Sequence, residues 1–329
     1  MNAIVSIAQT RFVRHLFLFL GSLVFLGGIV KAEERKPFFF IQLSDPQFGM
    51  NAQNADFQQE TANFEFAIAT ANRLKPAFMI VTGDLVNKAG DKSQAEEYLR
   101  ITAKLDRSIP LYQMPGNHDV GNAPTPESIA AYTARFGPDH YTFRSGSLLG
   151  VVLNSSLLRS PEGVRGQAQQ QDAWLKSELE KAMREGVPHV VVFQHHPWFV
   201  KNVDEPDQYD NLPRQERRRY LDLFHEHGVT HIFAGHYHAN SIGRYEAIEM
   251  VTTGAIGKPL RQDVSGMRIV IVRDAGIEHR FYHLGEIPNQ IDLAPPKKVA
   301  SIQGRLQDSE RQASLSMSRP AAAFLADLL

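Results

Sequence analysis

AFMIVTGDLVN, at residues 77–87, is an apolar run of strand length that ends in Gly83 and Asp84. Four other apolar runs also end in acidic, amide or imidazole side chains, and they read LSDPQFG (43–49), MPGNHD (114–119), VVVFQHHP (190–197) and IFAGHYH (232–238). Apolar runs separated by helical patterns indicate a mostly parallel sheet. Because the carboxyl ends of parallel strands meet at one edge, we expect these polar side chains to gather in one crevice.

The periodicity of the chain predicts an α/β fold. Strands are expected at 38–43, 77–82, 109–114, 148–153, 189–193, 229–234, 250–253, 267–272 and 277–282, and helices at 58–74, 92–105, 126–136, 169–184 and 213–227. The last strands follow one another without helices, which favours an antiparallel portion. We therefore expect four layers in the order αββα, with two mixed β-sheets packed face to face and flanked by helices. This domain should span 33–290, and 291–329 should form a flexible tail.

Composition excludes several classes of protein. The 329 residues include 35 Lys+Arg and 36 Asp+Glu, giving a formal net charge of −1, which argues against broad neutralisation of nucleic-acid phosphates. The sequence has no cysteine, so disulfides, cysteine nucleophiles and Cys-ligated zinc are excluded. The 13 histidines are therefore the main candidates for nitrogen ligands.

The N-terminal segment, 1–32, has the pattern of a secretory signal peptide. Arg11 and Arg14 precede an uncharged run over residues 16–30, and the sequence Val30-Lys31-Ala32 resembles a cleavage site. Fifteen uncharged residues are short for a membrane-spanning helix. We expect export to the periplasm or the extracellular space, with an uncleaved membrane anchor as the alternative.

The donors at the strand ends predict a metal centre. Carboxylates, amide oxygens and neutral imidazoles suit Mn, Fe or Zn ions, and there are enough donors for two ions. Asp84 is the natural bridge, because a carboxylate has two oxygens. His236 and His238 are separated by one residue, so an extended segment would direct one ring to each ion. Asn117 offers a carbonyl ligand, and its neighbour His118 would then lie over the metals.

The ordered motifs D-x-[HQ], G-D-x-x-N, G-N-H-D, H and G-H-x-H resemble the calcineurin-like metallophosphoesterase superfamily. The resemblance covers about residues 37–285. The phrases DPQFG, GDLVN, FQH-P and GHYH are most similar to its branch of calcineurin-like phosphoesterase domain-containing protein 1. Purple acid phosphatases would have a Tyr where this chain has Asn87, and calcineurin-type phosphatases would have Asp-Arg-Gly starting there.

The resemblance implies a role for each matching residue. It assigns the first metal to Asp45, Asp84 and His238, with Gln47 nearby, and the second metal to Asp84, Asn117, His195 and His236. His118 matches the proton donor of the superfamily. Gln47 departs from the wider pattern, which has His at that position, so it would ligate through its amide oxygen or not at all.

Two neighbours of these residues have open roles. His196 could replace His195, but adjacent residues on an extended segment face opposite ways, which favours His195. Asp119 is a candidate catalytic residue that either fixes the tautomer of His118 or caps the following turn. The basic run 217–219 is interpreted as a solvated helix face. The remaining histidines of the domain are expected to be surface or satisfied core residues, namely His140, His189, His225, His227, His231, His279 and His283.

The expected activity is hydrolysis of phosphate monoesters by a metal-bridging hydroxide, with His118 as general acid. Its substrate would be a phosphorylated small molecule or a phosphoprotein, without nucleic-acid partners or stable membrane insertion after signal cleavage. One alternative is a metal-dependent phosphodiesterase that acts on nucleotides or lipid head groups. The other is a metal-binding protein without catalytic activity, in which Gln47 marks a damaged first site.

Overall fold

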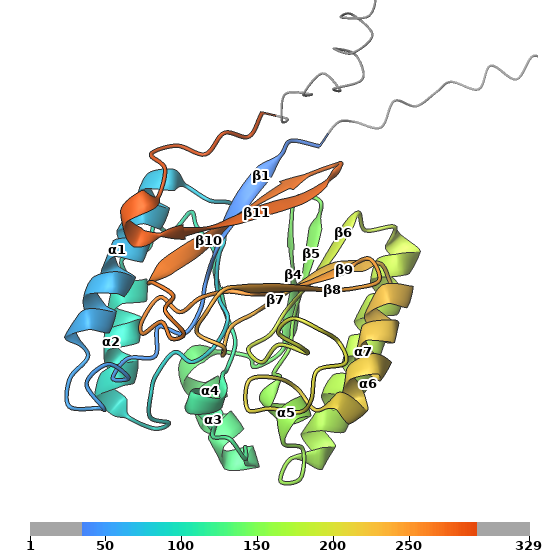
Figure 1. The fold of residues 1–329 in the computed structure, drawn as a ribbon, viewed down its shortest axis with the longest axis horizontal. Coiled ribbons are helices and arrows are strands. Elements are labelled where there is room, and N and C mark those ends of the chain that lie inside the picture. Colours follow the sequence, from blue (N-terminus) through green and yellow to red (C-terminus); the bar gives the residue numbers. More distant parts are fainter. Residues whose placement is uncertain (1–34, 295–329) are drawn as a thin grey trace, which may run out of the picture. The chain divides into compact units, whose positions relative to one another are not determined.

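A computed structural model of the chain describes residues 35–294, which contain two mixed β-sheets (Figure 1). The first sheet has the order β11 (Gly276–His283), β10 (Gly266–Arg273), β1 (Phe38–Leu43), β2 (Met79–Val81) and β3 (Leu111–Gln113). The second has the order β4 (Tyr141–Ser145), β5 (Leu148–Val152), β6 (His189–Phe193), β7 (Val229–Ala234), β9 (Ile248–Thr252) and β8 (Ser241–Tyr245). Strands β1–β3 run parallel to one another, as do β5, β6, β7 and β9.

Helices cover the outer face of each sheet. Helices α1 (Gln58–Leu74) and α2 (Lys92–Thr102) lie on the first sheet, and α6 (Arg165–Glu185) and α7 (Arg214–Glu226) lie on the second (Figure 1). A third apolar cluster draws its side chains from both sheets and fills the space between them. The predicted four-layer α/β architecture is therefore confirmed. The short helices α3 (Asn117–Val120) and α5 (Ser156–Arg159), the helix α4 (Pro126–Phe136) and the 3₁₀ turn η1 (Leu284–Glu286) complete the elements.

Strand β1 shows why these residues form a buried central strand. Ile41 and Leu43 pack into the helix-side core, whereas Phe40 points into the core between the sheets. The Phe40 ring stacks on Phe78 at 4.5 Å and meets Phe193 of the opposite sheet edge-on at 5.8 Å. Full burial of one such side chain contributes about 1.5–3 kcal/mol to folding. Strand β1 is thus fixed against both neighbouring layers.

The sequence did not predict strands β4 and β8. Each lies at an edge of the second sheet, where alternate side chains such as Arg144 and Ile242 face solvent. Neither strand therefore has the continuous apolar run that marks a strand buried on both faces. The late strands are also not all antiparallel, because β9 pairs with β7 in parallel register, Ile232 opposite Met250.

The proposed signal peptide at 1–32 and most of the predicted tail lie outside the described residues. Just before residue 295, Ile291 and Leu293 pack against the helix-side core of the first sheet. In the region 35–294, no helix has the length and apolar character that a membrane span requires.

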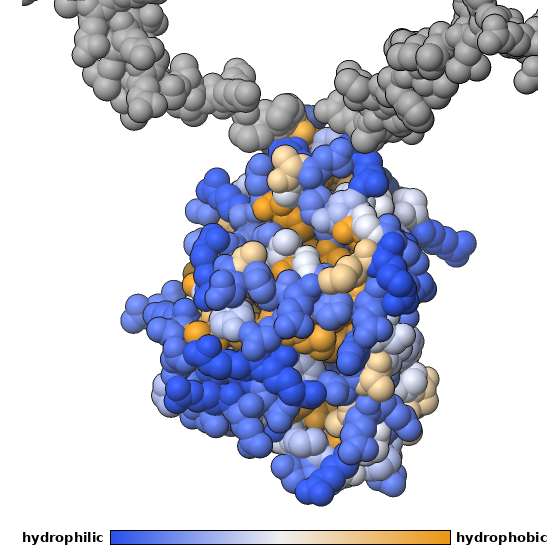
Figure 2. Space-filling view, turned by 90° about the vertical axis from the view of Figure 1, so that its right-hand side faces the viewer, coloured by the Kyte–Doolittle hydropathy of each residue, from blue (hydrophilic) through white to orange (hydrophobic). Residues whose placement is uncertain are grey.

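On the side of α6 and α7, hydrophilic residues cover most of the surface and leave orange apolar areas between them (Figure 2).

Candidate metal centre

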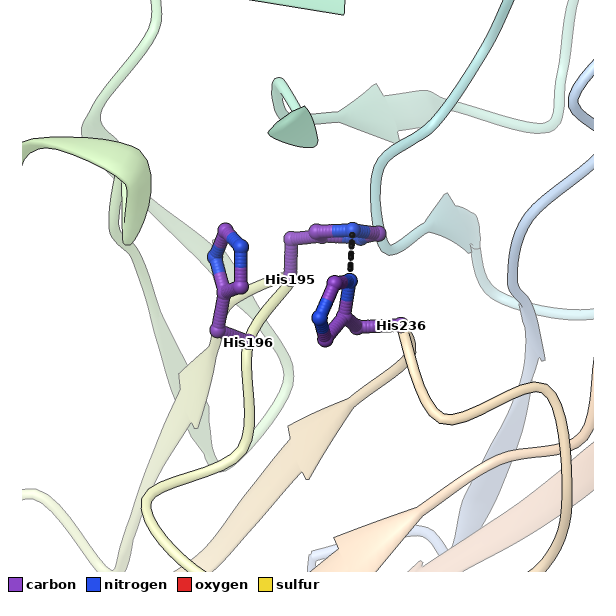
Figure 3. A group of neighbouring side chains, drawn as sticks. All are labelled: His195, His196 and His236. Atoms are coloured by element: carbon purple, nitrogen blue, oxygen red, sulfur yellow. Dashed lines mark hydrogen bonds between the residues drawn. The ribbon is translucent and has the colours of Figure 1, made fainter. Parts of the chain in front are cut away.

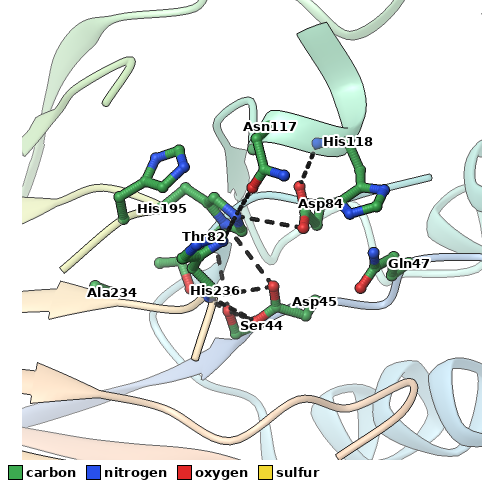
Figure 4. Close-up of polar contacts among 12 residues, drawn as sticks. Ser44, Asp45, Gln47, Thr82, Asp84, Asn117, His118, His195, Ala234 and His236 are labelled. Carbon is green, nitrogen blue, oxygen red and sulfur yellow. Dashed lines mark hydrogen bonds and ion pairs between the residues drawn. The ribbon is translucent and has the colours of Figure 1, made fainter. Parts of the chain in front are cut away.

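The carboxyl ends of five strands bring the predicted donors together. Asp45 follows β1, Asp84 follows β2, and Asn117 opens α3 directly after β3. The second sheet contributes His195 after β6, and His236 and His238 after β7. Figure 4 shows that side chains from both sheets converge on one space. All seven residues of the predicted ligand set, which also includes Gln47, are buried.

The donors form two neighbouring groups. Ligand atoms of Asp45, Asp84 and His238 all lie within 4.8 Å of one another, and so do those of His195, His196 and His236. An Asp84 carboxylate oxygen lies 3.3 Å from His195 Nε2, which joins the two groups. The two groups therefore meet at Asp84, the residue that the sequence predicts to be shared by two ions.

An unusual backbone conformation directs several of these side chains. Five candidate ligands have positive φ, and they are Asp45 (49°), Gln47 (41°), Asp84 (50°), His236 (66°) and His238 (55°). Such values are uncommon for residues other than glycine. Gly83 precedes Asp84 and has φ +86°, and a Cβ there would lie 2.5 Å from His195 Nδ1. The glycine lets the first sheet approach the imidazole of the second.

Backbone carbonyls set the tautomers of two histidines. His195 Nδ1 donates to the carbonyl of Thr82 at 2.9 Å, and His238 Nδ1 donates to that of Lys258 at 2.7 Å. In each neutral ring the Nε2 lone pair then faces the site, where His238 Nε2 lies 3.4 Å from Asp45. Metal-ligating histidines use such contacts to fix the ring and its tautomer.

The contact between His195 and His236 indicates that a cation belongs between them. His236 Nε2 donates to the carbonyl of Tyr209 at 2.8 Å, which leaves its Nδ1 as the acceptor in the neutral ring. This Nδ1 lies 3.2 Å from His195 Nε2, the free nitrogen of the other ring. Two lone pairs that face each other repel unless a proton or a metal ion lies between them. The second group of donors therefore fits a metal.

Two side-chain amides present oxygen to the same space. Asn117 Nδ2 donates to Asn122 Oδ1 at 3.0 Å, while its Oδ1 lies 3.1 Å from His195 Nε2. Gln47 Nε2 donates to Asn87 Oδ1 at 3.1 Å. Its Oε1 is buried and has no hydrogen-bond partner among the described residues. A buried oxygen without a partner is costly, and a metal ion would satisfy it.

Replacement of Gln47 by Leu tests this oxygen directly. The variant keeps the approximate side-chain volume but removes the donor, so we expect Mn²⁺ affinity at the first site to fall roughly tenfold or more. Titration calorimetry and metal analysis would measure the loss, and Gln53→Leu, at an exposed position, is the matched control. Unchanged affinity and stoichiometry would show that Gln47 does not ligate.

The charged groups of the site shift one another's pKa values. Burial alone would lower the pKa of His195, but the neighbouring Asp84 carboxylate outweighs it and raises that pKa to about 9. Burial would raise the pKa of Asp84, yet His195 holds it below its usual value. Burial and the charge of His195 lower the pKa of His236 to about 4. Asp45 likewise raises the pKa of His238, so His195 and His238 are the two ligand histidines that favour the protonated form in the metal-free protein.

Metal binding should therefore depend on pH. A metal must displace the proton of His195, so Mn²⁺ affinity should rise roughly tenfold per pH unit from pH 6.5 to 8 and level off near 9. The same raised pKa stabilises the metal-free fold below pH 6.5, and this stabilisation is lost as the pH rises through about 9. Calorimetry in buffers of different ionisation enthalpy should detect the release of protons when the metal binds. An affinity that is constant over this range would contradict the assignment.

His118 stands beside Asp84. Its backbone N–H donates to Asp84 Oδ1 at 2.9 Å, and its ring Nδ1 donates to the carbonyl of Asn87 at 2.7 Å. Asp119 does not contact this ring. Its carboxylate accepts the backbone N–H groups of Leu85 (3.0 and 3.1 Å) and Gly116 (2.8 Å). These contacts favour the cap role of Asp119, which ties the loops after β2 and β3 together.

The carboxyl group of Asp119 is also electrostatically unusual. Burial and the nearby charge of Asp84 raise its pKa to about 7. Its Oδ1 also accepts the backbone N–H of Val86, at 3.1 Å. Asp119 is therefore a buried positioning residue that lies behind the ligands and carries both loops.

Two side chains at the site, His196 and Tyr209, lie outside the predicted ligand set. His196 does not face away from His195, since their ring centroids lie 4.9 Å apart and both rings approach His236 (Figure 3). The expectation of opposite orientations was wrong because the chain leaves the extended conformation after Phe193, where β6 ends. Tyr209 reaches the site from a long loop. Only the adjacent histidines gave a sequence signal.

A further donor group, formed by His231, Glu249 and His279, joins the two sheets at the opposite end of β7. Arg268 Nη1 donates to His279 Nδ1 at 3.0 Å, and a guanidinium can only donate. The neutral His279 ring therefore carries its proton on Nε2, which donates to Glu249 at 2.7 Å. That nitrogen has no lone pair for a metal, so this group is a satisfied polar network, as expected for these histidines.

The basic run 217–219 is only partly solvated. Arg218 and Arg219 face solvent and pair with Asp204 and Asp172. Arg217 is fully buried instead, and its guanidinium donates to the carbonyls of Val203 (2.7 Å), Glu205 (2.8 Å) and Leu212 (3.0 Å). The prediction of a solvated face is wrong for this residue. Its role is to hold the loop between β6 and α7.

Comparison with known proteins agrees with this geometry. The family described as "Calcineurin-like phosphoesterase" matches residues 40–240. Serine/threonine-protein phosphatase CPPED1 from Bos taurus is 39% identical over 270 residues, which cover 78% of this chain and 86% of the relative. The Homo sapiens protein of that name is 37% identical over 273 residues, covering 78% and 87%.

Structural comparison gives the same fold. The crystal structure of a dimetal phosphatase from Danio rerio superposes with a TM-score of 0.53 at 14% sequence identity, and the match covers 74% of this chain and 99% of that one. The superfamily and branch predicted from the motifs, and the prediction of a phosphoester hydrolase, are confirmed. The chain belongs to the calcineurin-like phosphoesterase family.

Proposed function

We propose that this hydrolase acts as a phosphomonoesterase whose two metal ions share Asp84 and whose general acid is His118. The observation that carries the proposal is the pair of buried donor groups joined at Asp84, with His118 held against the same carboxylate. The relatives are named serine/threonine-protein phosphatases, which favours monoesters over diesters.

The residues present fit two divalent or mixed-valence ions of Mn, Fe or Zn. The unpartnered Gln47 oxygen and the facing lone pairs of His195 and His236 support this fit. The first ion would be held by Asp45, Asp84, His238 and Gln47, and the second by Asp84, Asn117, His195 and His236. When bound, two such ions lower the pKa of a coordinated water and neutralise charge on the phosphoryl oxygens.

The chain itself supplies order and proton transfer. Both carboxylate oxygens of Asp45 accept the backbone N–H of His236, each at 3.2 Å. This contact fixes the loop after β7 against the loop after β1. His118, with Nδ1 engaged by the Asn87 carbonyl, directs Nε2 outward. In its protonated form this nitrogen would give a proton to the departing alkoxide.

Hydrolysis of two nitrophenyl esters tests the proposal. The chain loaded with Mn²⁺ should hydrolyse p-nitrophenyl phosphate in preference to bis-p-nitrophenyl phosphate, and Asp84→Ala should remove the activity. Preference for the diester would instead support the phosphodiesterase alternative. Two bound metals without turnover of either ester would support the metal-binding protein without catalytic activity.

We propose that the substrate is a phosphorylated protein or a phosphorylated small molecule. The relatives are named protein phosphatases, which favours the protein. Release of phosphate from phosphoserine and phosphothreonine peptides, compared with small phosphate monoesters at equal concentration, would separate the two classes. A higher kcat/KM for the peptides would assign a protein substrate.

We also propose that the chain is exported through residues 1–32. The support is the basic start, the uncharged run and the cleavage-like Val30-Lys31-Ala32. N-terminal sequencing of the mature protein should begin at residue 33. A membrane-bound product that retains residues 1–32 would indicate an uncleaved anchor.

A further inference from the structure

Tyr209 lies beside the candidate ligands but holds no ligand position in the two groups. Its ring centroid is 4.8 Å from that of His236, and its backbone carbonyl accepts His236 Nε2 at 2.8 Å. Asn117 Nδ2 donates to the Tyr209 hydroxyl at 3.1 Å. In spite of these contacts the side chain is 56% exposed. Tyr209 therefore touches the second donor group on one side and solvent on the other.

The loop between β6 and α7 is anchored so that this position is fixed. Next to Tyr209, both carboxylate oxygens of Asp210 accept Arg261 Nη2, at 2.9 and 2.7 Å. The Arg261 guanidinium stacks on Tyr237 at 4.0 Å and donates to its carbonyl at 2.6 Å. Tyr237 lies between the candidate ligands His236 and His238. The loop is thereby tied to the ligand segment itself.

A second anchor lies on the other side of the tyrosine. Arg159 Nη2 of α5 donates to the carbonyl of Gln208 at 3.3 Å, one residue before Tyr209. The buried Arg217 holds three more carbonyls of the loop. A phenol that is fixed on both sides yet half exposed is already arranged for a contact, so little conformational entropy is lost when one forms.

The hydrogen-bond direction leaves the hydroxyl proton available. Because the Asn117 amide donates to Tyr209, the tyrosine oxygen acts as acceptor in that bond. In the part of the chain that the structure describes, no acceptor is recorded for the tyrosine O–H. The hydroxyl proton of Tyr209 is therefore free to be donated. It lies next to the Asn117 amide, whose oxygen faces the candidate metal centre.

We propose that Tyr209 is a substrate-binding residue whose hydroxyl donates a hydrogen bond to a phosphoryl oxygen of the substrate. The inference rests on the proposed phosphoesterase function and deepens it. It identifies a contact from the loop that follows the His195 motif, at a residue outside all five metal motifs. Inorganic phosphate, the product, offers the same oxygens and is the simplest probe.

Replacement of Tyr209 by Phe removes the hydroxyl and keeps the ring. With saturating Mn²⁺, we expect the inhibition constant of inorganic phosphate and the KM for p-nitrophenyl phosphate to rise roughly ten- to a hundredfold, the effect of one hydrogen bond to a charged group. Mn²⁺ affinity should change less than twofold. Tyr245→Phe is the matched control, because Tyr245 lies on β8 and bonds Asp222, and its phosphate inhibition should equal that of the parent.

A purely structural role would give a different result. If Tyr209 only orients Asn117, Tyr209→Phe would weaken Mn²⁺ binding and leave phosphate inhibition at saturating metal unchanged, which would overturn the proposal. If the parent protein is active and Tyr209→Phe has the same phosphate inhibition constant and the same KM, the proposal is also overturned. An inactive parent would instead refute the proposed function, so the two failures are distinguishable.

The anchor offers an independent variant that leaves the phenol in place. Asp210→Asn keeps the side-chain shape but removes the charge that pairs with Arg261. Looser placement of Tyr209 should raise the phosphate inhibition constant in the same direction by a smaller factor, about two- to threefold. Combined with Tyr209→Phe, the Asn substitution should add nothing further. If the effects of the two substitutions were fully additive, the ion pair between Asp210 and Arg261 would act independently of Tyr209.

Discussion

Asp84→Ala is expected to lower kcat/KM by more than roughly a thousandfold, because both metal sites lose a ligand at once. Asp84 reaches both donor groups: one carboxylate oxygen lies 3.3 Å from His195 Nε2, and its ligand atom lies within 4.8 Å of those of Asp45 and His238. Metal analysis after dialysis should find less than one ion per chain. The phosphatase assay should fall in parallel.

Two further variants make this result specific. Asp84→Asn keeps the shape and the acceptor for the His118 N–H, so it separates loss of charge from loss of packing. It should also lose metal, whereas Asp204→Asn, at an exposed position, should retain both metal and activity. Retention of two metals by Asp84→Asn would contradict the bridging role.

His118→Gln is expected to retain both metals and to lower kcat by about a hundred- to ten-thousandfold, as loss of a general acid does. The Gln amide can occupy the place of the ring but cannot release a proton. The defect should therefore grow as the leaving group becomes more basic. Phenyl phosphate should suffer more than p-nitrophenyl phosphate, and the ratio of the two kcat values measures the effect.

The control for this variant is His225→Gln, at an exposed position on α7. It should match the parent on both substrates. Loss of metal from His118→Gln would instead place His118 among the ligands. An equal fall for both leaving groups would show that His118 acts on substrate binding and not on proton transfer.

The sequence was informative wherever the chain is locally regular. The apolar run 38–43 predicted β1 with its bounds, and the helical spacing predicted α1 and α4 at their observed positions. The side chains that follow β1, β2, β3, β6 and β7 were predicted to converge, because parallel strands end at one edge. This prediction depends only on the direction of each strand and on the sheet to which the strand belongs, and the hydrophobic pattern indicates both.

Contacts between distant segments were beyond the sequence. The tautomers of His195 and His238 depend on the carbonyls of Thr82 and Lys258, which the fold brings in from elsewhere. Nothing in the local pattern shows that the loop after β6 returns Tyr209 to His236. Likewise, burial of Arg217 arises from the loop that wraps it, whereas helical periodicity and charge favour a solvated face.

The left-handed backbone at the ligands has a consequence for the lifetime of the protein. Five non-glycine residues hold positive φ at the centre, and each costs about 1 kcal/mol or more unless the surroundings support it. Their sum is comparable to the net stability of an ordinary domain. Ions that bind only the folded chain would offset this cost by mass action. Chelation should therefore expose the ligand loops to proteases first, so that metal supply sets how long the enzyme survives.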